Sequence, residues 1–335
     1  MLVWSRRGSW IQEMLQDRNV YIPITDRRRN PTSRKELELQ GKLLDLKKLG
    51  NLDETDYWKL RPSDSTPASF YGLPKIHKVV LQQMDDHLTL PEDTETPIPL
   101  RPINSSSILK HLANETEYSV KDANQFAEFV SNQELAEDEL IVSFDVISLF
   151  TSIPIDMAID IVQRKLEKSD DWKNHIQLTK SQILDLLFFL LHKSYFIFEG
   201  TQYHQVSGCA MGSPVSAVIA ELVMQEVEEK ALETSPVRPK WWRRYVDDSN
   251  ACMKQNGVEV FHSHLNSMNA NIQFTVEMPT ITMGKKSIAF VDTNSTVNED
   301  GKLEVGVYRK ATHTSKYLDF HSHSPAQSKR AVVKT

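Results

Sequence analysis

The tetrapeptide Tyr245-Val246-Asp247-Asp248 is the stretch of this 335-residue chain that decides its fold. It lies between two runs that favour strands, residues 241–244 and 249–253, which predicts a tight hairpin. Successive side chains along a strand point to opposite faces, so this hairpin would hold at least one carboxylate rigidly at its tip. Anchored carboxylate oxygens are the ligands that Mg²⁺ prefers, but an Asp pair in a turn is more often merely solvated. The interpretation therefore depends on residues elsewhere in the chain.

A third carboxylate, Asp145, ends a β-branched and aromatic run within the segment 140–150. This run predicts a buried strand, and Pro154 after it predicts the start of a helix. Asp145 could cap that helix, but a buried strand seldom keeps a charge unless the charge is paired or binds a metal ion. Together with the Asp pair of the hairpin, the metal-binding interpretation is the better one.

The segment between these acids contains a run of small residues, 208–217, which leads into a helix carrying Leu222, Val223 and Val227. Small residues at a helix start let a base pair or another backbone approach closely, and free amides there suit a polyanion. The alternative is an ordinary Gly/Ser/Pro turn before a helix. The order of the three motifs along the chain favours the first interpretation.

This order resembles the palm of reverse transcriptases. More extended motifs, found in sequence order over residues 57–335, are similar to the reverse transcriptases of Penelope-like retroelements. The resemblance implies an α+β right-hand polymerase with fingers and palm, an antiparallel catalytic sheet packed on helices and a thumb that is largely missing. The motifs are Phe70–Lys78, Leu100–Ile103, Ser143–Pro154, Ala210–Pro214, Val307–Thr314 and Tyr317–Phe320.

The resemblance also implies a domain order and an activity. Residues 1–60 are expected to form a helical region, 61–139 the fingers, 140–310 the palm with the catalytic motifs, and 311–335 a truncated palm-to-thumb junction. The activity would be that of an RNA-directed DNA polymerase, which extends a primer 3′-hydroxyl. Its partners would be an RNA template, a DNA primer and dNTPs. The alternative is an inactive, truncated remnant that only binds nucleic acid.

The family's metal site carries over onto four residues. Asp145, Asp247 and Asp248 match the catalytic carboxylates, with Asp145 and Asp247 as direct ligands of both ions. The backbone carbonyl of Val146 matches the usual backbone ligand. The resemblance therefore implies two Mg²⁺ or Mn²⁺ ions per active site.

The substrate contacts carry over onto further residues. Phe150, five positions after Asp145, matches the ring that rejects a 2′-hydroxyl, although it could also be one more core aromatic. Ala217 departs from the family pattern, where many relatives carry Pro. Contacts to the incoming nucleotide are expected from Lys75, Arg101, Met211 and Gly212, contacts to nucleic acid from Tyr245, Lys329 and Arg330, and a lysine near the leaving pyrophosphate from Lys285 or Lys286.

Composition fits a nuclear or cytoplasmic enzyme that is not secreted. The net charge of −6 at first argues against a nucleic-acid partner. However, residues 1–50 hold 11 Lys/Arg against 6 Asp/Glu, and residues 302–335 hold 7 against 2, so basic ends could contact phosphates. The two cysteines indicate reduced thiols, since they lie in different motifs. No membrane partner is expected, because the apolar run 183–191 is too short to span a bilayer.

Local patterns predict several further elements. A capping box at Ser33–Glu36 predicts the start of a helix that Gly50 ends. Asp53 predicts the start of a second short helix, and residues 183–191 predict a buried one. Hairpins are expected over residues 195–203 and around the turn 298–301. Residues 62–102 are expected to hold two extended strands and an acidic loop.

Overall fold

The computed structural model describes residues 12–25, 31–63, 68–69, 109, 112–113, 116–174, 177–210, 213–282 and 284–309. Within these ranges the helices are α2 (Pro31–Lys48), α3 (Glu54–Leu60), α5 (Ala123–Ser131), α6 (Leu149–Ser152), α7 (Ile155–Lys168), α8 (Lys180–His192), α9 (Pro214–Thr234) and α10 (Val258–Ser267), with 3₁₀ turns η2 (Asp171–Asn174) and η3 (Gln255–Gly257).

The strands of the described part form three sheets. The first has the order β1 (Tyr21–Ile24), β5 (Thr201–Gln205), β4 (Ser194–Phe198), β2 (Ala68–Ser69). The central sheet has the order β6 (Trp241–Tyr245), β7 (Asp248–Lys254), β3 (Glu139–Val146), β8 (Phe274–Glu277). The third has the order β12 (Leu303–Val307), β11 (Thr293–Val297), β10 (Lys285–Phe290), β9 (Thr280–Thr282).

The central sheet is antiparallel throughout and is covered on both faces. On one face, Val142 and Phe144 of β3 pack into the main core with helices α7, α9 and α10. On the other face, Ile141 of β3 and Cys252 of β7 pack into a second core with α5 and the third sheet. This double burial explains why residues 140–146 read as an almost continuous apolar run, since a strand buried on both faces loses its polar alternation.

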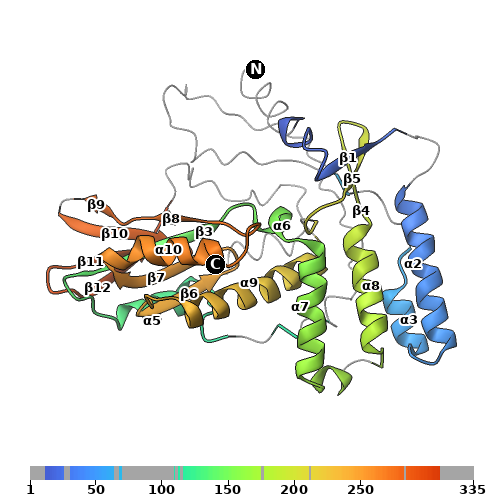
Figure 1. The fold of residues 1–335 in the computed structure, drawn as a ribbon, viewed down its shortest axis with the longest axis horizontal. Coiled ribbons are helices and arrows are strands. Elements are labelled where there is room, and N and C mark those ends of the chain that lie inside the picture. Colours follow the sequence, from blue (N-terminus) through green and yellow to red (C-terminus); the bar gives the residue numbers. More distant parts are fainter. Residues whose placement is uncertain are drawn as a thin grey trace, which may run out of the picture.

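Figure 1 shows α9 and α10 lying along the central sheet, with α7, α8 and α2 side by side at the other end of the molecule. Ion pairs and apolar contacts join these upright helices, for example Lys42 of α2 to Asp185 of α8 at 2.7 Å. The first sheet stands at one end of α8 (Figure 1). Its own small core contains Leu15, Tyr21 and Phe196.

The α+β class and the antiparallel sheet packed on helices, both expected from the sequence, are confirmed. The strand ending at Val146, the hairpins β4–β5, β6–β7 and β11–β12, and the helix after residue 213 also lie where the sequence predicts them. Asp53 caps α3 through its side chain, which accepts a hydrogen bond from the Asp56 N–H at 2.7 Å.

The predicted start of α2 is wrong by three residues, since a capping box with Ser33 as N-cap makes Arg34 the first helical residue. The helix begins at Pro31, not at the capping box of Ser33–Glu36. Proline suits the first turn of a helix because the N–H that it lacks would have no partner in the helix. The predicted end is confirmed, because Gly50 takes a left-handed conformation (φ 75°) and the Asn51 N–H bonds back to the Leu46 carbonyl. Of the two strands expected in residues 62–102, the described part contains only β2; the rest lies outside it.

Candidate functional site

A row of four side chains crosses one end of the central sheet on a single face. In register, Tyr245 of β6 pairs with Asp248 of β7, Asp248 pairs with Asp145 of β3, and Asp145 pairs with Thr275 of β8. Directly opposed residues of an antiparallel pair send their side chains to the same face, with Cβ atoms about 4.5–5.5 Å apart. The pairing therefore places two carboxylates next to each other, although they are more than a hundred positions apart in sequence.

The third sheet does not cover this end of the face. Further along the same face, Trp241, Cys252 and Ile141 form a matching row, and these three are buried in the second core. At the carboxylate end, by contrast, Tyr245 is 39% exposed and Asp248 and Thr275 are also exposed. The carboxylate row thus lies on the open part of a face whose other part is packed, where a large ligand can reach it.

Asp247 lies in the turn that joins β6 to β7. The turn consists of Val246 and Asp247 only, and Val246 has φ 57°, a left-handed conformation that is a genuine outlier for a β-branched residue. The backbone N–H of Val146 donates to the carbonyl of Asp247 at 3.3 Å, so the hairpin tip is bonded to the end of β3. The three predicted carboxylates are therefore gathered at one sheet end by backbone geometry.

The donor set at this end fits a divalent cation. Two like charges that face each other across a strand pair destabilise the sheet, and a bound cation would reverse that effect. Carboxylate and carbonyl oxygens are also the hard ligands that Mg²⁺ and Mn²⁺ prefer. Within the described residues, no three His, Cys, Asp or Glu side chains are already close enough to hold a metal ion together. The backbone is in place, and rotation of the carboxylate side chains would have to complete the site.

Phe150 lies in α6, which follows β3 in the chain, and is half-buried against the main core. Its carbonyl accepts a hydrogen bond from the Cys209 N–H at 2.6 Å. Gly208, with φ 74°, approaches the same backbone so closely that a Cβ atom would lie 2.6 Å from the Thr151 Cα. The small residues at 208–209 therefore allow a close approach to a backbone, as the sequence suggested, and that backbone is α6 of this chain.

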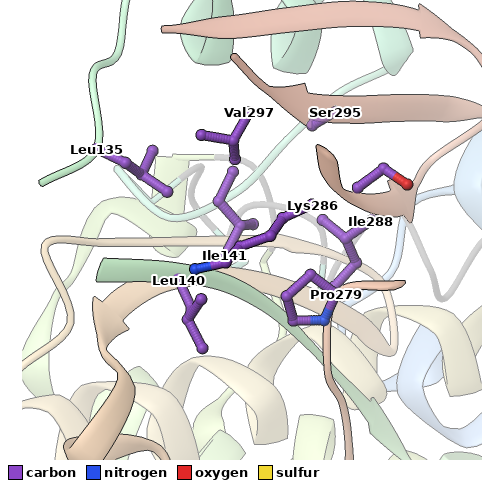
Figure 2. Close-up of a pocket in the computed structure, with 9 residues that line it drawn as sticks. Leu135, Leu140, Ile141, Pro279, Lys286, Ile288, Ser295 and Val297 are labelled. Atoms are coloured by element: carbon purple, nitrogen blue, oxygen red, sulfur yellow. The ribbon is translucent and has the colours of Figure 1, made fainter. Parts of the chain in front are cut away.

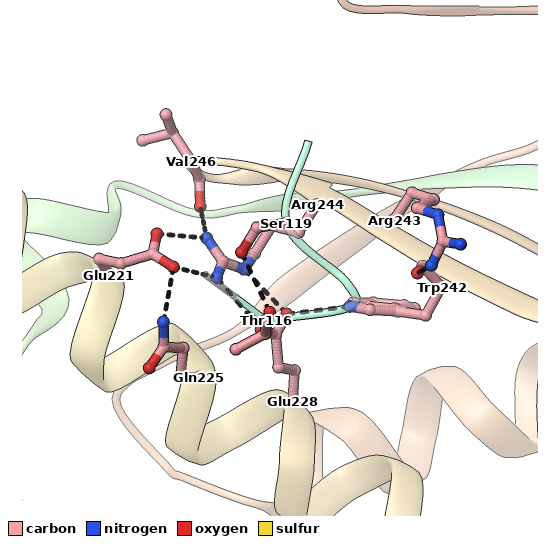
Figure 3. A network of polar contacts seen from close by, with 9 residues as sticks. All are labelled: Thr116, Ser119, Glu221, Gln225, Glu228, Trp242, Arg243, Arg244 and Val246. Carbon is pink, nitrogen blue, oxygen red and sulfur yellow. Dashed lines mark hydrogen bonds and ion pairs between the residues drawn. The ribbon is translucent and has the colours of Figure 1, made fainter. Parts of the chain in front are cut away.

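Sequence reasoning missed a buried polar network behind the carboxylate row (Figure 3). Arg244 of β6 is 1% exposed and contacts Glu221 and Glu228, both on α9. Trp242 also donates to Glu228 at 3.0 Å. The signal was present in the sequence, since Glu221 and Glu228 are seven positions apart on α9 and flank a mostly apolar segment with Leu222, Val223 and Val227. A seven-residue spacing puts them on one face of the helix, and an acid that is buried there, as Glu228 is, requires a basic partner.

The network shifts the pKa of each member. Burial raises the pKa of Glu228 above its usual value, against the opposing effect of Arg244. For Glu221 burial acts in the same direction, but the hydrogen bonds and charge of Arg244 outweigh it and lower the pKa. Burial acts to lower the pKa of Arg244, and the two glutamates raise it above its ordinary value. Arg244 therefore stays charged.

Of the other residues predicted to contact substrate, the structure describes only the two lysines of β10. Lys285 donates to Asn298 at 3.2 Å, and Lys286 lines a narrow cavity between the central and third sheets, together with Ile141, Pro279 and Ile288 (Figure 2). The remaining predicted residues lie outside the described part of the chain: Lys75, Arg101, Met211, Gly212, Lys329 and Arg330.

Comparison with known proteins finds no matching family model and no matching curated protein. Among solved structures, the chain is similar to a telomerase from Candida albicans in complex with a telomeric RNA fragment (15% identity, TM-score 0.45, 61% of this chain and 38% of that one). It is also similar to an apo telomerase from Candida tropicalis (12% identity, TM-score 0.47, 61% and 39%). A third similar structure is the RNA-dependent RNA polymerase of a human picorbirnavirus (10% identity, TM-score 0.36, 59% and 34%).

The chain thus spans well under half the length of these polymerases. At such TM-scores the similarity adds no weight to a function, so the assignment depends on the sequence motifs and on the geometry of this chain. Among the helices of the described residues, none is long and apolar enough to cross a membrane.

Proposed function

We propose that this chain is the fingers and palm of an RNA-directed DNA polymerase of the Penelope-like retroelement type. The observation that carries the proposal is the strand register, which sets Asp145 directly opposite Asp248 and bonds the Asp247 turn to Val146. Adjacent carboxylates at an open sheet end, followed by an aromatic residue on a short helix, suit nucleotidyl transfer. The proposed domains are the helical region 1–60, the fingers 61–139, the palm 140–310 and the junction 311–335.

Asp145 and Asp247 would hold two Mg²⁺ or Mn²⁺ ions, with Asp248 and the Val146 carbonyl as further ligands. When bound, such ions lower the pKa of the attacking hydroxyl and neutralise charge on the leaving group. The chain's own part is to fix the ligand oxygens in place and to position the substrates. Tyr245, exposed beside Asp248, would contact the primer strand.

Phe150 would select the sugar of the incoming nucleotide. Its ring is half-buried, and its backbone is held by the Cys209 N–H. A fixed ring excludes a 2′-hydroxyl by its volume alone and needs no polar contact. We assign the triphosphate and base contacts to Lys75, Arg101, Met211 and Gly212, and phosphate contacts along the nucleic acid to Lys329 and Arg330, all on the strength of the sequence motifs.

The direct test is primer extension on an oligo-primed RNA template with purified protein, dNTPs and Mg²⁺ or Mn²⁺. We expect extension by the wild type and none by Asp145→Asn, because an amide keeps the shape of the carboxylate but loses its charge. Wild-type extension by Asp145→Asn would disprove the metal assignment. Binding of primed RNA by the wild type without extension would favour the alternative, a remnant that only binds nucleic acid.

The sugar assignment has its own test. Phe150→Val should still add dNTPs but admit rNTPs, so the ratio of the two incorporation efficiencies should fall. If Phe150 served only the core, its truncation would cost stability and reduce both activities together. An unchanged ratio in a folded, active variant would disprove the role of this ring.

A further inference from the structure

The guanidinium of Arg244 uses every one of its donors. Its Nε donates to Glu228 at 2.8 Å, and its Nη2 donates to Glu221 at 2.8 Å and to Glu228 at 3.1 Å. Its Nη1 donates to Glu221 at 2.8 Å and to the backbone carbonyl of Val246 at 3.3 Å. A guanidinium has five N–H donors in a fixed planar arrangement, so these bonds define both the position and the orientation of the group.

One of these bonds reaches the turn that carries Asp247. Val246 is the left-handed residue of that turn and is 45% exposed, so packing contributes little to its conformation. The carbonyl that Arg244 contacts belongs to the peptide group that links Val246 to Asp247. A shift of the guanidinium would therefore move or release the peptide group that precedes the Asp247 Cα, and with it the Asp247 side chain.

The other four bonds connect this turn to helix α9. Glu221 and Glu228 lie on one face of α9, and Gln225 between them donates to Glu221 at 2.9 Å. Hydrogen bonds also fix the backbone of Arg244, since its N–H donates to Tyr118 at 2.7 Å and its carbonyl accepts from Val120 at 2.8 Å. Arg244 is thus held at both its backbone and its side chain.

The two glutamates differ in how far they are buried. Glu228 is completely buried, whereas the side chain of Glu221 is 30% exposed. With one positive and two negative charges, the cluster keeps a net negative charge when both glutamates are ionised. The guanidinium has no donor left over to compete with a cation for the carboxylates of the site.

We propose that Arg244 is a positioning residue for nucleotidyl transfer, which holds the Val246–Asp247 peptide against helix α9 and so sets the distance between the Asp247 and Asp145 carboxylates. This inference rests on the proposed function. Its chemical basis is the strictness of Mg²⁺, which demands near-octahedral ligands at about 2.0–2.1 Å. A turn that loses its contact with α9 should therefore bind Mg²⁺ less well, while substrate contacts elsewhere in the site are unaffected.

The test compares Arg244→Lys and Glu221→Gln with Glu226→Gln. Lysine keeps the charge but has three donors instead of five, and the Gln at 221 weakens the hold on the guanidinium. Glu226 is the matched control, because it lies on the same helix but pairs with Arg164 at 2.7 Å, away from Arg244. Circular dichroism and thermal unfolding would establish that each variant is folded; if Arg244→Lys does not fold, Glu221→Gln decides.

The readout is the Mg²⁺ concentration that gives half-maximal primer extension. In both test variants it should rise about tenfold with a lower kcat, as expected for a misplaced ligand, while the KM for dNTP stays within about twofold. Glu226→Gln should match the wild type. Equal Mg²⁺ dependence in all variants, or the same loss in Glu226→Gln, would overturn the proposal.

Two measurements separate failure of this inference from failure of the proposed function. Mn²⁺ binding, followed by electron paramagnetic resonance, needs no turnover and should weaken in Arg244→Lys. If the wild type neither extends primers nor binds Mn²⁺, the proposed function fails, and hydrogen exchange of residues 243–250 then decides the structural claim. Faster exchange there in Arg244→Lys but not in Glu226→Gln supports the positioning role, and unchanged exchange refutes it.

Discussion

Two hairpins of this molecule have two-residue turns with different sequences and different surroundings. The β4–β5 hairpin turns through Glu199 (φ 48°) and Gly200 (φ 74°), and the β6–β7 hairpin turns through Val246 (φ 57°) and Asp247. Each turn carries one acid. Glycine adopts a positive φ at little steric cost, whereas a residue with a Cβ atom loses about 1–2 kcal/mol there. Both turns therefore carry a left-handed residue with a side chain at their first position, Glu199 or Val246, and the β-branched Val246 tolerates that conformation less well.

The difference lies in what surrounds each turn. The Val246–Asp247 turn is bonded to Val146 of β3 and to Arg244, so neighbouring elements impose its conformation. Glu199 is exposed and accepts a bond from the Gln12 side chain at 3.3 Å. Strain alone does not mark the site, because the β10–β11 turn also has a left-handed valine, Val291 (φ 45°). Strain at a turn that lies beside opposed carboxylates is what points to function.

The strongest contrast between the hairpins should come from their acids. Asp247→Asn should abolish nucleotide addition, since the amide cannot replace a charged metal ligand. Glu199→Gln should leave addition unchanged. If Asp145 and Asp247 hold the same ions, as proposed, the double variant Asp145→Asn/Asp247→Asn should be hardly worse than either single one. Primer-extension rates measure all four proteins, and a comparable loss in Glu199→Gln would remove the distinction between the two turns.

The loop between the two hairpins should tolerate no side chain at Gly208. Gly208→Ala combines an unfavourable positive φ with a Cβ 2.6 Å from the α6 backbone. Gly50→Ala has the same conformational penalty (φ 75°) but no heavy atom within 4 Å. Urea unfolding should show a cost of about 1–2 kcal/mol for Gly50→Ala and roughly 1–3 kcal/mol more for Gly208→Ala. Equal costs would mean that the loop is not packed on α6.

Exchanging the turn residues should separate stability from activity. Val246→Gly relieves the left-handed strain, so the free energy of unfolding should stay equal or rise by up to about 1 kcal/mol, while primer extension slows because the turn is freer. Gly200→Val should lose about 1–2 kcal/mol and keep its activity per folded molecule. Faster extension by Val246→Gly would contradict the idea that the strained turn is held in place for function.

Near neutral pH the smallest expected effect concerns the two thiols, one in β7 and one in the loop before α9. Burial raises the pKa of both Cys209 and Cys252 to about 12, from an ordinary value of 9.0. The folded state therefore keeps protons that the unfolded state loses above pH 9, so stability should fall as pH rises from about 9 towards 12. The slope should be at most about 1.4 kcal/mol per pH unit for each thiol.

The check is urea unfolding at several alkaline pH values. Cys252→Ala should reduce the slope of stability against pH relative to the wild type. The variant lacks one of the two thiols that lose a proton when the chain unfolds at alkaline pH. Alkylation of the native protein at pH 8 should also be slow at both positions. An identical pH slope in Cys252→Ala would show that other groups account for the alkaline loss of stability.

The sequence alone determined many of the local elements of this protein and singled out three acids as the predicted site. Alternation and turn residues predicted the hairpins β4–β5, β6–β7 and β11–β12, and a run of apolar residues predicted β3, because these signals depend on neighbours a few positions apart. The start of α2 was wrong because the capping box at Ser33 competed with Pro31, and both are valid signals for a helix start. The site roles of the carboxylates came from motif order and stay predictions.

Only the tertiary structure decided which acid faces which. The pairing of Asp145 with Asp248, the addition of β1 to β5, and the contact of Arg244 with Glu221 and Glu228 all join segments distant in sequence. Local periodicity carries no information about register between strands; packing on both faces of the sheet sets it, since a slip of one residue would turn every buried side chain outward. The same packing buries Arg244 and leaves the neighbouring carboxylate row open to a ligand.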